Sequence, residues 1–188
     1  MTGCDCAGTA RSRRRVLGGI AAVAAGGLAG CLGDDGDDEP EPTQPIALGD
    51  GATCDVCGMV IEEHFGPAGQ LYFADGEPAD RDGPARFDSI VELATYLEER
   101  TRRGWELRAA FVTDYSSVDY DLEERNGTTY VSSHVEASAF ADATDCSYVV
   151  DSAVEGAMGP DYVPFSREAD AAAFADEHGG DVRSWDGL

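Results

Sequence analysis

The stretch Ser89-Ile-Val-Glu-Leu-Ala-Thr-Tyr-Leu-Glu-Glu-Arg-Thr-Arg-Arg-Gly104 decides how the folded part of this chain is organised. Its apolar residues recur at intervals of three and four from Ile90 to Leu97, which places them on one face of a helix. The serine at its start and Glu92 three residues later form a capping box, and the glycine at its end follows the last turn. The pattern predicts an amphipathic helix that packs against a sheet.

Segments rich in β-branched and aromatic residues lie on both sides of this helix and predict strands. The strands are predicted at 70–74, 107–113, 121–125, 128–132, 147–151, 162–165 and 181–185. Asn126-Gly127 is a strong turn signal and predicts a hairpin between the third and fourth of them. A second helix is predicted from about Arg167 to Glu177, with Ser166 as its N-cap and Gly179-Gly180 at its end.

The order of elements around the second helix repeats the order around the first. Each run passes a methionine-containing turn, a strand, a phenylalanine followed by Asp or Ser, a helix, a glycine and a closing strand. We therefore predict an α+β fold, a small single domain of two related β–α–β-like halves that begins near Ile46 and runs to the end of the chain.

The charge of the chain excludes one class of partner. Its 37 acidic residues face 13 basic ones, all of them arginine, which gives a formal net charge of −24. A chain this acidic repels phosphate, so no nucleic-acid partner is expected. Because 43% of the residues are hydrophobic and cluster in periodic segments, the chain can build a core. The charge indicates a solvated acidic surface of the kind found in halophilic proteins.

The N-terminus has the pattern of an export signal. Arginines at 11–15 precede the apolar run Val16–Leu28, and Leu28-Ala-Gly-Cys31 resembles the lipobox of secreted lipoproteins. Residues 1–30 are therefore predicted to be a twin-arginine-type lipoprotein signal, with lipid attached at Cys31. Residues 31–45 form an acidic linker, because like charges and Pro keep a chain extended. The protein is expected to be exported and anchored to the outer face of the cell membrane.

The segment Cys54-Asp-Val-Cys57-Gly58-Met59 is the most informative for function. Its spacing brings two sulfur atoms to one small cavity, Gly58 allows a sharp turn, and Met59 can direct a thioether to the same point. Thiolate and thioether form a soft ligand set, which favours Cu(I). A redox dithiol, a structural zinc site that recruits Cys146 and a histidine, and a plain disulfide remain alternatives.

Two further residues are candidate ligands. Met158 stands between glycines in a turn, where it is poorly placed to fill a core, so it is either a third soft ligand or an ordinary loop residue. His178 ends the second helix, where an imidazole either suits the helix dipole or serves as a ligand. No Ser/His/Asp order or pair of acids argues for hydrolysis, so the protein is not expected to be an enzyme.

Taken together, these motifs resemble the NosL family, lipoproteins of nitrous oxide reductase maturation. The resemblance runs from Cys54 to Trp185. It rests on Cys54-x-x-Cys57-Gly58-Met59, Gln70, Phe87-Asp88, Phe111–Tyr115, Tyr148-Val149, Met158-Gly159, Pro164-Phe165 and Glu177-His178-Gly179-Gly180. The chain departs from the family at Ala157, where a proline is common, and in the acidic loop 116–127.

The resemblance implies a function and a site. Members of the family are lipid-anchored, bind one Cu(I) and pass it to the apo-reductase. By this resemblance residues 46–188 form a NosL-like copper-binding domain, and the metal ligands are Cys54, Cys57, Met59, Met158 and His178. The expected partners are apo nitrous oxide reductase, other maturation proteins and the membrane. The alternative functions are a secreted thiol–disulfide oxidoreductase and a structural zinc-binding lipoprotein.

Overall fold

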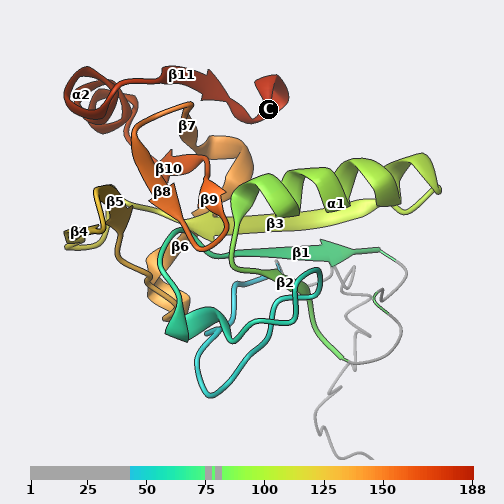
Figure 1. Ribbon diagram of the computed structural model, residues 1–188. Helices are drawn as coiled ribbons and strands as arrows, with labels where there is room; N and C mark the ends of the chain where they lie inside the picture. Colours follow the sequence, from blue (N-terminus) through green and yellow to red (C-terminus); the bar gives the residue numbers. More distant parts are fainter. Residues whose placement is uncertain (1–42, 75–77, 79–81) are drawn as a thin grey trace, which may run out of the picture. The chain divides into compact units, whose positions relative to one another are not determined.

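The structure is a computed structural model that describes residues 43–74, 78 and 82–188 (Figure 1). The predicted signal at 1–30, its lipidation site Cys31 and most of the linker lie outside these residues. The strands are β1 (Gly69–Phe73), β2 (Ala85–Phe87), β3 (Leu107–Thr113), β4 (Leu122–Arg125), β5 (Thr128–Val131), β6 (Phe140–Asp142), β7 (Ser147–Val150), β8 (Val154–Gly156), β9 (Gly159–Pro160), β10 (Val163–Phe165) and β11 (Asp181–Ser184). The α-helices are α1 (Ile90–Arg102) and α2 (Glu168–His178), and short 3-10 helices occupy Ile61–Glu63, Ala137–Ala139, Ala143–Asp145 and Trp185–Gly187.

The first unit is built around α1 and the sheet β2-β1-β3-β6. Strand β1 is antiparallel to both β2 and β3, and the chain crosses from β2 to β3 through α1. The predicted capping serine holds the helix start, because the Ser89 hydroxyl accepts a hydrogen bond from the Glu92 N–H. Ile90 and Leu93 are fully buried against the sheet, which confirms the amphipathic face.

The second unit repeats this plan with the sheet β10-β7-β11 and α2. Strand β7 is central and antiparallel to both neighbours, as β1 is in the first unit. The two related halves are thus present, each as β–β–α–β; the first has one strand, β2, that was not predicted, whereas β7, β10 and β11 of the second were all predicted. The short strands β2, β6, β8 and β9 were not predicted from the sequence, because two or three residues are too few to show a period. The two methionine turns also differ in place: Met59 precedes β1, whereas Met158 lies between β7 and β10.

A third sheet, β4-β5-β8-β9, carries two hairpins with two-residue turns. The predicted Asn126-Gly127 turn joins β4 to β5, and both residues have positive φ (55° and 86°). The second hairpin, β8–β9, turns through Ala157 and Met158. Strand β8 is parallel to β5, so the same sheet positions both turns.

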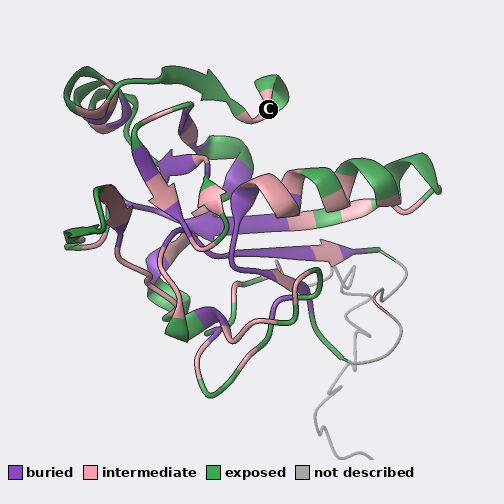
Figure 2. Cartoon of the chain, in the orientation of Figure 1, coloured by how far each residue is buried: buried purple, intermediate pink, exposed green. Residues whose placement is uncertain are grey.

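Strand β7 links the cores of the two units, because both of its faces are buried (Figure 2). Tyr148 and Val150 point to one side and pack in the cluster formed by β1, β2, β3 and α1. Val149 points to the other side and packs with Phe165 and Phe174 of the second unit. This alternation follows from the two-residue period of a strand, and it joins the halves into one packed domain.

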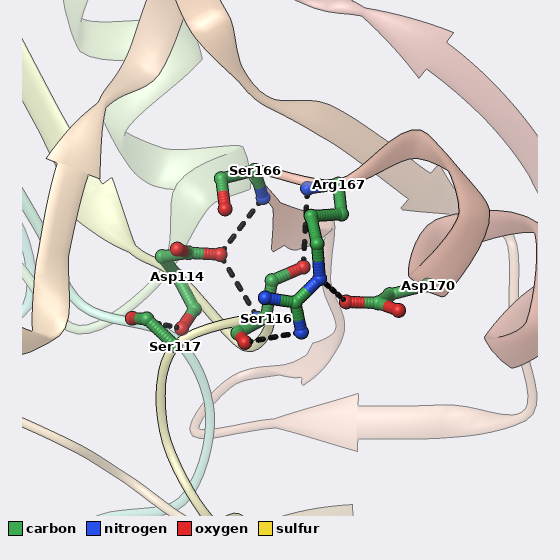
Figure 3. A network of polar contacts seen from close by, with 6 residues as sticks. All are labelled: Asp114, Ser116, Ser117, Ser166, Arg167 and Asp170. Atoms are coloured by element: carbon green, nitrogen blue, oxygen red, sulfur yellow. Dashed lines mark hydrogen bonds and ion pairs between the residues drawn. The ribbon is translucent and has the colours of Figure 1, made fainter.

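The start of α2 corrects one prediction. Ser166 is not the N-cap; the cap position is Arg167, and no side chain caps the helix there. The backbone N–H of Ser166 donates to Asp114 Oδ1, and that of Arg167 donates to Ser116 Oγ (Figure 3). The Arg167 side chain also donates to the Ser116 carbonyl and pairs with Asp170. Residues far away in sequence therefore hold the segment that leads into the helix, and the first helical N–H groups receive no side-chain cap.

Within residues 43–74, 78 and 82–188, no helix has the length and apolar character needed to cross a bilayer.

Candidate metal centre

The cysteine motif folds into a tight loop ahead of β1. The Cys54 N–H donates to the Met59 carbonyl at 2.9 Å, and the Gly58 N–H donates to the Cys54 carbonyl at 3.0 Å. Gly58 has φ +75°, a conformation that costs other residues strain, so the glycine permits the turn as the sequence suggested. The loop directs both cysteine side chains to one side.

Contacts with β2 hold this loop beside the first turn of α1. The Asp55 N–H donates to the Arg86 carbonyl at 2.8 Å, and the Arg86 N–H donates to Asp55 Oδ2 at 2.7 Å. Arg86 lies in β2, and the helix begins four residues later. The loop and the N-terminus of α1 are therefore neighbours, although some 30 residues separate them in sequence.

Four side chains meet between the loop and the helix. The Cys54 thiol donates to Glu92 Oε2 at 3.3 Å, and the Cys57 thiol lies 3.4 Å from both oxygens of Asp88. One ligand atom from each of the four residues lies within 4.8 Å of the others. Cys54 and Asp88 are buried, while Cys57 and Glu92 are partly exposed, so the cluster opens to solvent on one side.

The environment keeps both thiols protonated when no metal is bound. Burial raises the pKa of Cys54 far above its ordinary value, although three backbone N–H groups act in the opposite direction. Burial also raises the pKa of Cys57, and the charge of Asp88 adds to this effect. Since a metal binds the thiolate, metal loading must release these protons. Cys54, Cys57 and Cys146 are all free thiols, so the disulfide alternative does not describe this structure.

The donor set fits a metal ion. Two sulfur atoms can take up a soft monovalent ion in a two- or three-coordinate arrangement, whereas the two carboxylates offer the hard oxygen donors that divalent ions accept. Among the described residues, these four side chains form the group that could hold a metal ion. The group contains no histidine.

The structure brings together Cys54 and Cys57 among the predicted ligands. Met59 is partly buried, and its carbonyl closes the loop. Met158 lies at the tip of the β8–β9 hairpin with 55% of its surface exposed. His178 ends α2, where its ring lies 4.6 Å from the Phe174 ring, outside the four-residue cluster. Metal ligation by these three residues stays a prediction.

Asp88 and Glu92 were not identified as site residues from the sequence. Asp88 precedes the capping Ser89, and Glu92 lies in the first turn of α1, so no helical spacing relates their side chains. A capping box explained Glu92, and nothing in the sequence showed which loop would cover this end of the helix. The structure shows that the Glu92 carboxylate accepts from Cys54 in addition to its place in the cap.

Asp161 connects the Met158 hairpin to the same end of α1. The carboxyl is 4% exposed, and its Oδ1 accepts the N–H groups of Ile90, Val91 and Tyr162 at 2.8–3.0 Å. Oδ2 has no hydrogen-bond partner among the described residues. Burial raises the pKa of Asp161 to about 7, although the hydrogen bonds it accepts lower it. Asp161, which belongs to the second unit, therefore accepts hydrogen bonds from two backbone N–H groups at the start of α1.

This carboxyl predicts a pH dependence of stability. Its pKa is higher in the folded chain than in the unfolded chain, so the folded state binds the extra proton between about pH 4 and pH 7. The free energy of unfolding is expected to fall as the pH rises from about 4 to 7, by about 4 kcal/mol in all from this group and by roughly 2–3 kcal/mol of that above pH 5. Urea unfolding at pH 5 and pH 8 in constant salt measures the difference. The Asp161→Asn variant keeps a hydrogen-bond acceptor but does not titrate, so its free energy of unfolding should change less between the two pH values. An equal change in the variant and the parent protein would contradict the assignment.

Comparison with known proteins points to one family. The NosL family profile matches residues 45–188. Over 163 residues the chain is 30% identical to the copper-binding lipoprotein NosL of Stutzerimonas stutzeri, covering 87% of this chain and 74% of that protein. It is also 30% identical over 148 residues to the copper-binding lipoprotein NosL of Achromobacter cycloclastes, covering 76% of this chain and 64% of that protein.

A solved structure has the same fold. The chain is similar to the crystal structure of the copper chaperone NosL from Shewanella denitrificans, with a TM-score of 0.60 and 27% identity. The similarity covers 78% of this chain and 96% of that chain. The α+β single domain predicted from the sequence is thereby confirmed.

Proposed function

This chain belongs to the NosL family, and on that basis we propose that it is a copper-binding chaperone that carries Cu(I) to apo nitrous oxide reductase. The observation that supports this most directly is the meeting of two thiols in one partly open cluster. Sulfur donors match the preference of Cu(I), and the relatives are named as copper-binding proteins or as a copper chaperone. No catalytic role is proposed.

The proposed mechanism is ligand exchange. Cys54 and Cys57 lose their protons and bind copper as thiolates, with Met59, Met158 or His178 as candidates for a further ligand. Cys54 is buried while Cys57 is partly exposed, so a ligand of the acceptor approaches from the side of Cys57. An acceptor thiolate, thioether or imidazole then binds the copper as the bonds to the donor break. The oxidation state of copper does not change in this exchange.

We further propose that the protein works on the outer face of the cell membrane. Two relatives are named lipoproteins, and this chain carries its own lipobox at Cys31 after a twin-arginine-type signal at 1–30. Residues 31–45 would tether the domain, since an acidic segment with prolines stays extended. Nitrous oxide reductase and its other maturation proteins are the proposed partners on that side.

A transfer experiment tests the proposed function. The chain loaded with one equivalent of Cu(I) should donate it to apo nitrous oxide reductase, so that copper content and nitrous oxide reduction appear together. Free Cu(I) at the concentration that the chain releases serves as the control. Donation no faster than this control would contradict the chaperone function.

The carboxylates favour a second candidate, a zinc site, because Asp and Glu oxygens accompany cysteine at some zinc centres. Metal analysis of the protein purified without added metal separates the two, because a structural zinc protein would carry stoichiometric Zn²⁺ and a copper chaperone would not. The oxidoreductase alternative has less support, because reactive dithiols have lowered thiol pKa values and both of these are raised. Insulin reduction measures that activity.

A further inference from the structure

A hollow of about 290 Å³ lies directly beside the four-residue cluster. One wall is the loop residue Val56, and the other is a single face of α1. The helix contributes Val91, Glu92, Thr95, Tyr96 and Glu99. Glu92 belongs to both places, since its carboxylate accepts from the Cys54 thiol at 3.3 Å. Whatever occupies the hollow is therefore in contact with a residue of the metal centre.

The walls of the hollow are apolar and its rim is acidic. Val56, between the two cysteines, is 52% exposed, so its apolar side chain is open to contact with a partner. Val91 and Tyr96 supply the opposite apolar wall, while Glu92 and Glu99 supply the charges. No basic side chain is among the described residues that line it.

We propose that this hollow is the docking site of the copper-accepting protein, and that it receives an apolar side chain flanked by Arg or Lys. The inference rests on the proposed function, because it concerns where the acceptor of that copper binds. Docking here brings the acceptor against Glu92, one of the two partly exposed residues of the cluster.

Size and charge together specify this occupant. The hollow is smaller than most ligand pockets, so it suits one inserted side chain rather than a whole metabolite. The two rim carboxylates complement positive charge on the partner; the Arg100 guanidinium packs 4.2 Å from the centre of the Tyr96 ring but does not line the hollow. Such rim charges mainly raise the association rate and make it sensitive to salt. A brief encounter that ends in metal transfer needs this kind of contact rather than a large interface.

Two substitutions on α1 test the docking site without touching either cysteine. Thr95→Phe fills the hollow, and Glu99→Lys reverses a rim charge. Matched controls lie on the same helix outside the hollow: Thr101→Phe makes the same change of residue, and Glu98→Lys makes the same reversal of charge. Glu98 pairs with Arg102 on the exposed surface, where loss of the pair has little effect on stability.

The measurement is the rate of Cu(I) transfer from each protein to apo nitrous oxide reductase. Thr95→Phe is expected to slow transfer about tenfold, as a blocked apolar contact does. Glu99→Lys is expected to slow it several-fold at low salt and to weaken its salt dependence. Both controls should transfer copper at the wild-type rate. Copper removal by a small Cu(I) chelator, which needs no docking, should be the same for all five proteins.

The outcomes separate the two proposals. Wild-type transfer rates for Thr95→Phe and Glu99→Lys, with normal transfer by the parent protein, would overturn the docking site alone. Equal slowing by Thr101→Phe and Glu98→Lys would overturn it as well, because the effect would then be general to the helix. If the parent protein transfers no copper to the reductase, the delivery function fails and this inference fails with it.

Discussion

Replacing Cys54 or Cys57 by serine is expected to lower the affinity for Cu(I) at least about a thousandfold, or about 4 kcal/mol. Serine keeps the size of the side chain but removes the soft thiolate, and the nearby carboxylate oxygens are hard donors that cannot replace it. The wild type should bind one Cu(I) per chain. Competition with a Cu(I) chelator of known affinity measures the change, with X-ray absorption reporting the number of sulfur neighbours.

Cys146→Ser is the matched control for this prediction. Cys146 is also a buried free thiol, but it packs in the core formed with Ala143 and Tyr148, outside the metal cluster. Its replacement should leave copper affinity unchanged. Met158→Ala probes the exposed thioether, and a loss of affinity there would add Met158 to the ligand set. Unchanged copper stoichiometry and affinity in the Cys54, Cys57 and Met158 variants together would remove the site assignment.

Replacing Gly66 by alanine is expected to lower the free energy of unfolding by about 3–4 kcal/mol. Gly66 has φ +99°, so any side chain there is strained. A Cβ would also lie 2.6 Å from the Gly156 Cα, an approach that backbone movement alone can relieve. This contact holds the segment after the cysteine loop against the hairpin that carries Met158. Urea unfolding at constant salt measures the loss.

Gly51→Ala separates strain from contact. Gly51 has a similar φ of +77°, but nothing lies within 4 Å of the position its Cβ would take. The free energy of unfolding of the Gly51→Ala variant should fall only by the cost of the strain, about 1–2 kcal/mol. Equal losses for the Gly51 and Gly66 variants would show that the packing against Gly156 contributes nothing.

Much of the fold could be predicted from local pattern. The face from Ile90 to Leu97 and the capping serine predicted α1, and Asn126-Gly127 predicted its hairpin, because periodicity and turn geometry act between near neighbours. The start of α2 was predicted incorrectly for the complementary reason. The backbone N–H groups of Ser166 and Arg167, just before the helix, donate to Asp114 and Ser116, which approach only when the two units pack.

In the candidate site, too, local pattern predicted one part and tertiary contacts supplied the other. The spacing of Cys54 and Cys57 predicted a shared sulfur site, because two intervening residues and a glycine leave the chain few other paths. Asp88 and Glu92 complete the cluster from the start of α1, more than 30 residues further along the chain. No local signal pairs that helix with the cysteine loop.

The sequence by itself therefore determined the soft character of the proposed site, the two repeating units and the acidic surface, since residue type, short-range period and charge need no tertiary contact. Only the tertiary structure decided what surrounds the sulfur atoms. The pairing of Asp55 with β2 places the loop on the N-terminus of α1, and burial there raises the pKa of both thiols. Such effects depend on distances through space, which the order of residues along the chain does not specify.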